Sequence, residues 1–247
     1  MKKVFAANWK LNKTPEEARE FIIKFKNEVF KVPGFFNTRE IIIFPQAFSI
    51  EALSSLCAET AIGFGPQNIY SEKSGAFTGE NSAEVAKALK CNFALVGHSE
   101  RREIFKEQND ILNKKTALLQ AIELTPVFCI GETLSQREAG KTLEVCFSQL
   151  DAGLVNLDKT KRIIVAYEPV WAIGTGKVAT TEQVAEVHRE LNKHLQKNSF
   201  GNFQLLYGGS VKPENSAELL SIPHVDGFLI GGASLQVDSF LKICGMD

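Results

Sequence analysis

Short stretches of consecutive apolar residues recur along the chain with a mean spacing of about 32 residues. Eight of them stand out, at residues 4–7, 41–44, 61–64, 93–96, 127–130, 163–166, 203–206 and 227–230. Each stretch is continuous instead of alternating with polar residues, which is typical of a strand buried on both faces of a parallel sheet. A strand, its crossover helix and the next strand take about 30 residues, so the spacing predicts a succession of β–α units.

Helix signals fill the intervals between these predicted strands. Residues 14–17 read Thr-Pro-Glu-Glu, a capping box with proline at the first helical position, and the apolar residues behind them recur with the period of a helix face. The same kind of box at residues 135–138 and at residues 180–183 predicts two more helix starts. Helices therefore alternate with the strands.

Eight β–α units in about 250 residues predict a closed (β/α)8 barrel of the α/β class, with residues 1–247 forming a single domain. An open, doubly wound sheet is the alternative architecture. That sheet usually carries a glycine-rich turn after its first strand, whereas the first turn here reads Asn8-Trp9-Lys10. The closed barrel is therefore the preferred prediction.

Composition and net charge narrow the classes of partner. The chain has 28 Lys and Arg against 29 Asp and Glu, a net charge of −1, with 44% hydrophobic and 23% charged residues. These values are those of a globular protein, not of a collagen or a disordered chain. They give no electrostatic reason to expect binding of nucleic acid or of an anionic membrane.

The N-terminal sequence and the cysteines bear on the compartment. The first apolar run ends at Asn8, too early for a signal peptide. No apolar stretch approaches the ~20 residues of a membrane span. The five cysteines form no C-x-x-C pair, so we expect reduced thiols in a cytoplasmic protein.

Polar and glycine residues gather directly after several of the predicted strands. Because all strands of a barrel run parallel, their carboxyl ends meet on one face, where the active sites of such barrels lie. The residues brought to that face are Asn8 and Lys10 after the first strand, His98 and Glu100 after the fourth, Glu168 after the sixth, Ser210 after the seventh, and Gly231 and Gly232 after the eighth.

These residue types suit the abstraction of a proton next to the carbonyl group of a phosphorylated substrate. Glycine turns after the seventh and eighth strands let backbone N–H groups approach a phosphate, which barrels often hold between those two loops. Glu168 can act as a general base and His98 as an acid or hydrogen-bond donor, while Lys10 adds a fixed positive charge. The sequence HRE at residues 188–190 lacks the spacing of a zinc-binding helix, so we expect no metal site.

Five segments of the chain, in order and across nearly its whole length, resemble the triosephosphate isomerase family. They read ANWK at residues 7–10, GHSERR at 97–102, AYEPVWAIGTG at 166–176, YGGS at 207–210 and GGAS at 231–234. The segment around Glu168 is very specific by itself. The resemblance implies a TIM barrel enzyme that interconverts dihydroxyacetone phosphate and D-glyceraldehyde 3-phosphate through an enediolate, in glycolysis and gluconeogenesis, with no cofactor.

The resemblance also implies a role for each candidate residue. Glu168 would carry the proton between the two carbons, His98 would polarise the carbonyl, and Lys10 would stabilise the enediolate and hold the phosphate. Asn8 would orient the substrate, and Glu100 would hold Lys10 in place. The backbone N–H groups that bind the phosphate would belong to Gly174, Ser210, Gly231 and Gly232.

A mobile lid and a homodimer are further implications of the resemblance. Residues 169–179 match the lid, with hinges at each end and with glycines at 174 and 176 that let the backbone approach the anion. Residues 69–80 match a loop that enters the partner subunit. This loop would bring Thr78 towards the substrate-binding residues of the other subunit.

Two other functions stay open from the residues alone. A phosphate-binding barrel could catalyse another reaction, such as an aldol-type cleavage or an indole-glycerol-phosphate conversion, or an inactive barrel could serve as a binding protein.

Outside the candidate site we expect one of Arg101 and Arg102 against Glu107 and the other on the surface. We expect histidines 188, 194 and 224, and the cysteines other than Cys129, on the surface or on helix faces.

Overall fold

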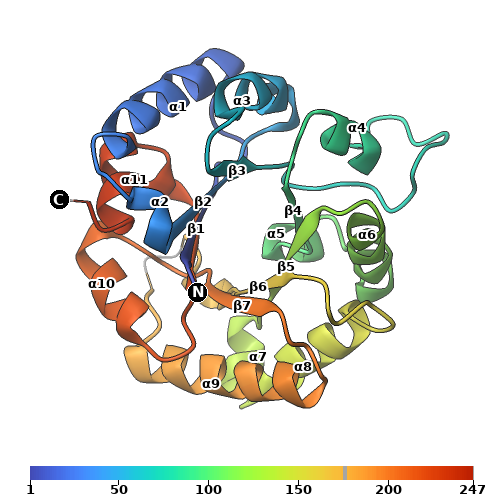
Figure 1. The fold of residues 1–247 in the computed structure, drawn as a ribbon. Helices are drawn as coiled ribbons and strands as arrows, with labels where there is room; N and C mark the ends of the chain where they lie inside the picture. Colours follow the sequence, from blue (N-terminus) through green and yellow to red (C-terminus); the bar gives the residue numbers. More distant parts are fainter. Residues whose placement is uncertain (175–176, 247) are drawn as a thin grey trace.

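The computed structural model describes residues 1–174 and 177–246, and in this part of the chain eight strands form one parallel sheet (Figure 1). The strands are β1 (Lys3–Asn8), β2 (Arg39–Phe44), β3 (Ile62–Phe64), β4 (Phe93–Val96), β5 (Thr125–Ile130), β6 (Ile163–Tyr167), β7 (Phe203–Tyr207) and β8 (Gly227–Ile230). Their order in the sheet is β3-β2-β1-β8-β7-β6-β5-β4, and the paired neighbours are parallel. All eight predicted strands are confirmed.

Backbone hydrogen bonds also join the two outer strands of this sheet. Asn92 N donates to Phe64 O (3.0 Å), and Leu95 N donates to Pro66 O (3.1 Å). These bonds connect the start of β4 with the end of β3, so the sheet curls into a nearly closed barrel. The structure therefore confirms the predicted barrel and rules out the open, doubly wound alternative.

Helices surround the strands on the outside of the barrel (Figure 1). They are α1 (Pro15–Val29), α2 (Phe35–Thr38), α3 (Ile50–Cys57), α4 (Ala83–Ala88), α5 (Ser99–Glu103), α6 (Asn109–Ala121), α7 (Leu134–Glu138), α8 (Thr142–Gly153), α9 (Thr181–Lys197), α10 (Pro213–Ser221) and α11 (Val237–Ile243). Short 3-10 turns form η1 (Ala47–Ser49), η2 (Val170–Ala172) and η3 (Gly232–Ser234). Among the described residues, no helix is both long enough and apolar enough to cross a membrane.

Capping residues decide where several of these helices begin. The predicted boxes at Thr14, before α1, and at Thr180, before α9, are both formed. The box predicted at residues 135–138 is wrong, because Thr133 caps α7, and a separate helix, α8, follows α7. Gly140 divides the two helices: its backbone is left-handed (φ 70°), a conformation that commonly ends a helix.

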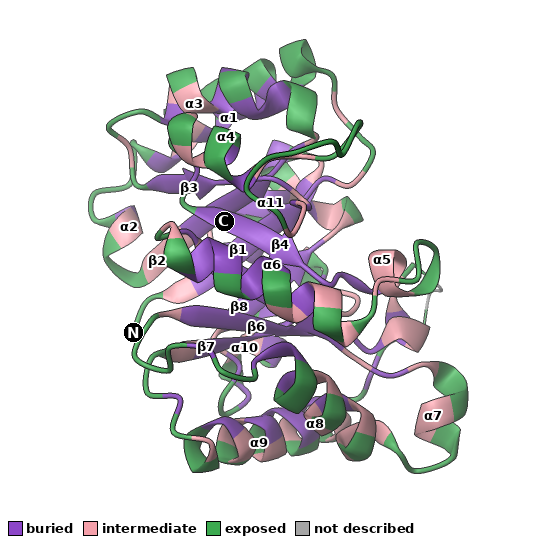
Figure 2. Cartoon of the chain, turned by 90° about the vertical axis from the view of Figure 1, so that its right-hand side faces the viewer, coloured by how far each residue is buried: buried purple, intermediate pink, exposed green. Residues whose placement is uncertain are grey.

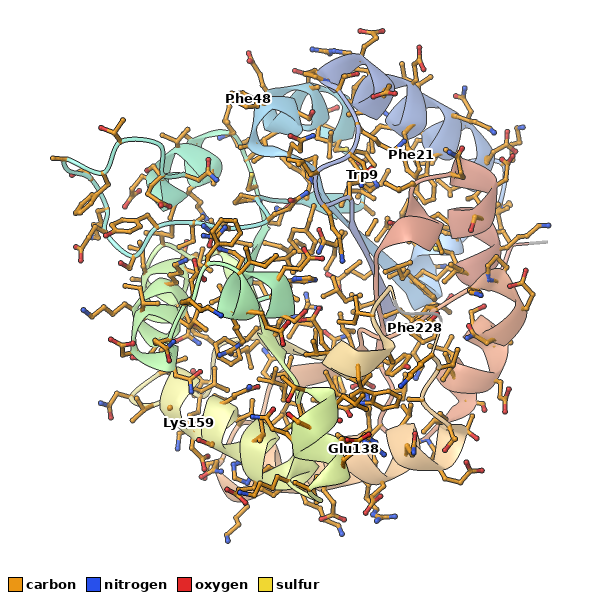
Figure 3. All side chains as sticks on the ribbon, turned by 180° about the vertical axis from the view of Figure 1, so that it is seen from behind. Trp9, Phe21, Phe48, Glu138, Lys159 and Phe228 are labelled. Atoms are coloured by element: carbon orange, nitrogen blue, oxygen red, sulfur yellow. The ribbon has the colours of Figure 1, made fainter. Side chains whose placement is uncertain are left out.

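Apolar side chains are buried on both sides of the strands. The inside of the barrel is filled from alternate strand positions such as Val4, Ala6 and Ile42. A larger cluster fills the layer between strands and helices, where Trp9 and Phe21 pack with ring centroids 5.0 Å apart (Figure 3). Figure 2 shows the strands buried and the outer helix faces exposed. Because both faces of each strand are covered, the apolar runs in the sequence are continuous.

Of the side chains expected on the surface or on helix faces, His188, Cys57 and Cys146 lie on buried faces of helices. Cys91 and Cys244 lie outside the helices and are buried instead; a thiol behaves as a small apolar group. Arg101 pairs with Glu107 as predicted (2.7 Å). Arg102, however, is not a surface residue, because its Nε donates to the carbonyl oxygen of Gly97 (2.8 Å). A guanidinium group that finds such acceptors can leave water without losing its hydrogen bonds.

Candidate active site

A cavity of about 340 Å³ lies at the carboxyl ends of five of the strands. Its walls come from the loops after β1, β4, β6, β7 and β8, which are far apart in the sequence. The residues predicted to contact the substrate all line it: Asn8, Lys10, His98, Glu168, Gly174, Ser210, Gly231 and Gly232. The structure therefore brings the predicted site residues together on the face where barrel active sites lie.

Glu168 lies directly after β6, and two residues that follow β4 hydrogen-bond to its carboxylate. Its Oε1 lies 2.9 Å from His98 Nε2, and its Oε2 accepts a hydrogen bond from Ser99 N (2.9 Å). Only 2% of the residue is exposed. Gly208 leaves room for it, because a Cβ on Gly208 would lie 2.9 Å from Glu168 Cγ. Both carboxylate oxygens are thus paired in a buried position.

His98 lies at the start of α5, and its hydrogen bonds define its protonation. Nδ1 accepts a hydrogen bond from Glu100 N (3.2 Å), which requires a lone pair on that atom, so the proton of a neutral ring is on Nε2. Burial lowers the pKa of His98, but the Glu168 and Glu100 carboxylates outweigh it and the pKa is raised. That increase depends on the contact with Glu168. Once this carboxylate moves away, burial favours the neutral ring.

Lys10 has a left-handed backbone (φ 51°), which is uncommon for a residue with a side chain. Two contacts hold this conformation: Lys10 N donates to Asn8 Oδ1 (3.1 Å), and Gln67 Nε2 donates to Lys10 O (2.8 Å). The ammonium group pairs with Glu100 Oε1 at 2.5 Å. Backbone strain of this kind concentrates at functional sites, and here it places a positive charge at the cavity wall.

The part of the cavity next to β7 and β8 is built from backbone. Gly174 is left-handed (φ 68°), and a Cβ on Gly231 would lie 3.6 Å from Lys10 Cε. Within the described part of the chain, the N–H groups of Ser210 and Gly232 donate no hydrogen bond. Backbone N–H groups without an acceptor, next to an ammonium group, are suited to bind an anion such as phosphate.

The segment after Glu168 is tied to Glu132, a fully buried residue after β5. Trp171 Nε1 and the Tyr167 hydroxyl both donate to Glu132 Oε1, at 2.9 and 3.1 Å, and Val170 N donates to Glu132 O (3.1 Å). Burial raises the pKa of Tyr167, so its hydroxyl stays protonated as a donor. The first hinge of the predicted lid is therefore anchored to the barrel in this structure.

The rest of the predicted lid is described in part. Gly174 lines the cavity, and Ala179, just before α9, is buried. Thr175 and Gly176 lie outside the described residues, so the expectation that Gly176 approaches the anion stays a prediction.

Sequence reasoning missed two residues that support this site, Gln67 and Glu132. Each contacts a partner far away in the sequence, Lys10 and Trp171 respectively, so no local pattern pairs them. A signal did exist for Glu132, because it is the second residue after β5, much as Glu168 is the first residue after β6. In the described residues, no group of three or more His, Cys, Asp or Glu side chains is placed to hold a metal ion.

Comparison with known proteins agrees with this geometry. The model of a protein family described as triosephosphate isomerase matches residues 3–246. A protein of Bdellovibrio bacteriovorus named triosephosphate isomerase is 53% identical over 246 residues, which is 100% of both chains. Proteins with the same name from Dictyoglomus turgidum and Aquifex aeolicus are 42% and 40% identical, each covering 98% of both chains.

Proposed function

This chain belongs to the triosephosphate isomerase family and interconverts dihydroxyacetone phosphate and D-glyceraldehyde 3-phosphate in glycolysis, and we propose that the cavity at the carboxyl ends of its strands is the place of that reaction. The observation that carries the proposal is the shared wall of one cavity. The residues that line it supply a carboxylate, an imidazole, an ammonium group and backbone N–H groups without an acceptor in the described part of the chain. No second site in the described residues combines these groups.

Glu168 acts as the base in this proposal. It takes a proton from C1 of dihydroxyacetone phosphate, and the electron pair of that C–H bond moves through C2 onto the carbonyl oxygen, which gives the enediolate. Glu168 then returns a proton to C2, while the hydroxyl proton of O1 passes to O2 and leaves an aldehyde at C1. To reach the substrate, the carboxylate gives up its hydrogen bond with Ser99 N.

His98 and Lys10 stabilise the charge that develops on the two oxygens. The Nε2–H of His98 now points at Glu168 and would donate to the enediolate oxygens once this carboxylate moves. Lys10 adds a positive charge that Glu100 and Asn8 keep in place. The N–H groups of Gly174, Ser210, Gly231 and Gly232 hold the phosphate, as expected of a site at this end of a barrel. No cofactor takes part in these steps.

The segment 169–179 serves as a lid in this proposal. An enediolate phosphate can lose its phosphate group by elimination, and exclusion of water by a closed lid limits such side reactions and strengthens the electrostatic contacts inside. The hydrogen bonds from Trp171 and Val170 to Glu132 would stabilise one of the positions that the lid adopts.

A homodimer completes the proposal. The loop at residues 69–80 extends beyond the helices as the teal segment of Figure 1, and Thr78 on it is exposed and lines no part of the cavity of its own chain. Large apolar side chains, among them Leu11 (88% exposed) and Phe48 (89% exposed, at the edge of the molecule in Figure 3), face solvent. A second copy would cover them and receive Thr78 near Asn8 and Lys10.

We also propose that residues 1–247 form one domain and that the enzyme works in the cytoplasm. The single sheet that runs from β1 to β8 supports one domain. The five free cysteines support a reducing compartment.

The decisive experiment replaces the base by its uncharged isostere. Glu168→Gln keeps the shape of the side chain but cannot accept the substrate proton, so kcat should fall by at least about 10³-fold. The assay uses dihydroxyacetone phosphate with a coupled dehydrogenase, after treatment with a chelator. Retention of wild-type kcat by a folded Glu168→Gln protein would remove Glu168 from the mechanism.

A further inference from the structure

His188 is a polar residue on an apolar helix face. The buried residues of α9 are Val184, Val187, His188, Leu191 and Leu195. Its side chain is fully enclosed between α9 and the barrel. The predicted active site makes no use of this histidine, and nothing in the reaction requires it to contact the substrate. A residue that served only to fill space here could be apolar like its four neighbours.

One hydrogen bond fixes the orientation of the His188 ring. Nδ1 lies 3.0 Å from the carbonyl oxygen of His224, and since a carbonyl can only accept, Nδ1 carries the proton. Nε2 is buried and has no partner among the described residues. Burial lowers the pKa of His188 to about 4, so the ring is neutral at pH 7. An acceptor atom left unpaired in the interior is unfavourable for stability and calls for a functional reason.

The ring of His188 lies against two tyrosines at the carboxyl ends of neighbouring strands. Its centroid is 6.0 Å from that of Tyr167, in an edge-on arrangement with planes at 78°, and 6.5 Å from that of Tyr207. Tyr167 ends β6 and Tyr207 ends β7, and the two strands pair at these residues. His188 therefore connects α9 with both strand ends.

Each of the two tyrosines lies next to a part of the proposed site that would move when the lid closes. Tyr167 precedes Glu168, and its hydroxyl donates to the Glu132 carboxylate that also holds Trp171 of the lid. The Tyr207 hydroxyl lies under the glycine turn after β7, because a Cβ on Gly209 would be 2.2 Å from it. The same Cβ would lie 3.1 Å from Pro169, at the first hinge.

The second hinge connects to His188 through the helix itself. α9 begins at Thr181, just after the predicted lid and its second hinge end at residue 179, and its capping box at Thr180 fixes where the helix starts. His188 lies two turns into this helix. Its contacts thus set the position of α9 relative to the strand ends that carry Glu168 and the glycine turn.

We propose that His188 is a positioning residue of the isomerase: anchored on His224 O, its ring holds Tyr167 and Tyr207 so that both lid hinges and Glu168 reach the closed arrangement together. It contacts neither substrate nor reacting atoms. The inference rests on the proposed function of the cavity, and it adds a link between α9 and the base. Loss of this link leaves a lid that closes incompletely, which admits water to the enediolate.

Two substitutions remove different halves of the link. His188→Phe keeps a ring but cannot donate to His224 O, whereas His188→Gln keeps an amide donor but no ring. Leu195→Ala is the matched control, because it weakens the same buried face of α9 two turns further along. For each protein we would measure kcat, KM, the midpoint of thermal unfolding, and the fraction of turnovers that release inorganic phosphate.

Both His188 variants should lower kcat about tenfold with little change in KM, and should raise the fraction of turnovers that release phosphate on the order of tenfold. Leu195→Ala should lower the midpoint of thermal unfolding but leave kcat and the fraction of turnovers that release phosphate unchanged. Either His188 variant decides the matter if the other does not fold. Folded variants with wild-type kcat and phosphate release would overturn the proposal, and so would an equal change in Leu195→Ala.

A parallel assay of Glu168→Gln separates the two proposals. If Glu168→Gln loses turnover while the His188 variants behave as the wild type, only the positioning role fails. If Glu168→Gln retains turnover, the proposed site itself is wrong.

Discussion

The two ends of the barrel differ in what surrounds their charged side chains. At the end where the strands begin, an arginine is hydrogen-bonded to several neighbouring strands, whereas at the carboxyl end the charged groups line a cavity. Arg162, just before β6, donates to both oxygens of Glu40 on β2 and to Gln204 on β7, and lies 5.8 Å from the ring of Phe93 on β4. These contacts join the starts of four strands. Lys10 at the other end has one carboxylate partner and the open space beside it.

We interpret this difference as a division between residues that stabilise the barrel and residues of the proposed active site. Strand starts bound to one another by charge-assisted hydrogen bonds have nothing left to offer a ligand. At the strand ends, the surrounding fold maintains backbone strain at Lys10 and N–H groups of Ser210 and Gly232 that have no acceptor among the described residues. Substitutions at the two ends should therefore affect different measurements.

The largest effect is expected from removal of the positive charge at the carboxyl end. Lys10→Met keeps the length of the stem but leaves the enediolate and phosphate without an ammonium group, so kcat/KM should fall on the order of 10³-fold. The unfolding midpoint should change little, because the ammonium group is partly exposed. An unaltered kcat/KM in the coupled assay would exclude Lys10 from the reaction.

The dependence of stability on acid pH tests whether His188, which lies between α9 and the strand ends, is buried in its neutral form. Because His188 has a pKa of about 4 when folded and an ordinary value near 6.5 when unfolded, the unfolded chain binds more protons between these values. The free energy of unfolding should therefore decrease as pH falls from 6.5 to 4, by about 3 kcal/mol from this group.

Urea unfolding at several pH values measures this contribution. His188→Gln carries no titrating ring, so the wild-type protein should lose more stability than the variant over the same interval. Parallel stability curves for the two proteins would show that His188 is not buried in its neutral form.

A smaller change at the carboxyl end concerns the reach of the base. Glu168→Asp withdraws the carboxylate by about 1 Å, which should lower kcat on the order of 10²-fold with KM little changed. The barrel should stay intact by circular dichroism. If this variant keeps full turnover, the position of the carboxylate does not limit the reaction.

The smallest of these effects is expected at the opposite end, and on a different quantity. Arg162→Met leaves Glu40 and Gln204 without their donor, so the free energy of unfolding should fall by about 1–2 kcal/mol while kcat is unchanged. Lys24→Met, which removes a pair exposed to solvent, is the control and should cost less than about 0.5 kcal/mol. A tenfold loss of kcat in Arg162→Met would remove the distinction between the two ends.

The sequence predicted the strands and the gathering of the candidate site residues at one end of the barrel for the same physical reason. Strands buried on both faces leave continuous apolar runs, and parallel strands force the residues that follow them onto one face. The sequence alone therefore predicted that Asn8, His98 and Glu168 lie close together, and all three line one cavity. The glycine turns after β7 and β8 belong to the same argument.

Other features depend on contacts that no local pattern encodes. The division between α7 and α8 rests on the backbone of Gly140, and the support of Lys10 by Gln67 spans 57 positions. His188 had a usable signal, since it falls between Val184 and Leu191 on the apolar period of its helix. Its burial followed from that period and not from the polarity of its ring.

The central claim is that Glu168, Lys10 and the backbone N–H groups act on one small anion within one cavity. A crystal structure with phosphoglycolate, an anion that carries a phosphate at one end and a carboxylate at the other, tests it most directly. We predict the phosphate at the N–H groups of Ser210 and Gly232, the ligand carboxylate next to Lys10 and His98, and the Glu168 carboxylate moved from Ser99 N to the ligand. A ligand bound elsewhere, or a Glu168 still hydrogen-bonded to Ser99 beside it, would contradict the account.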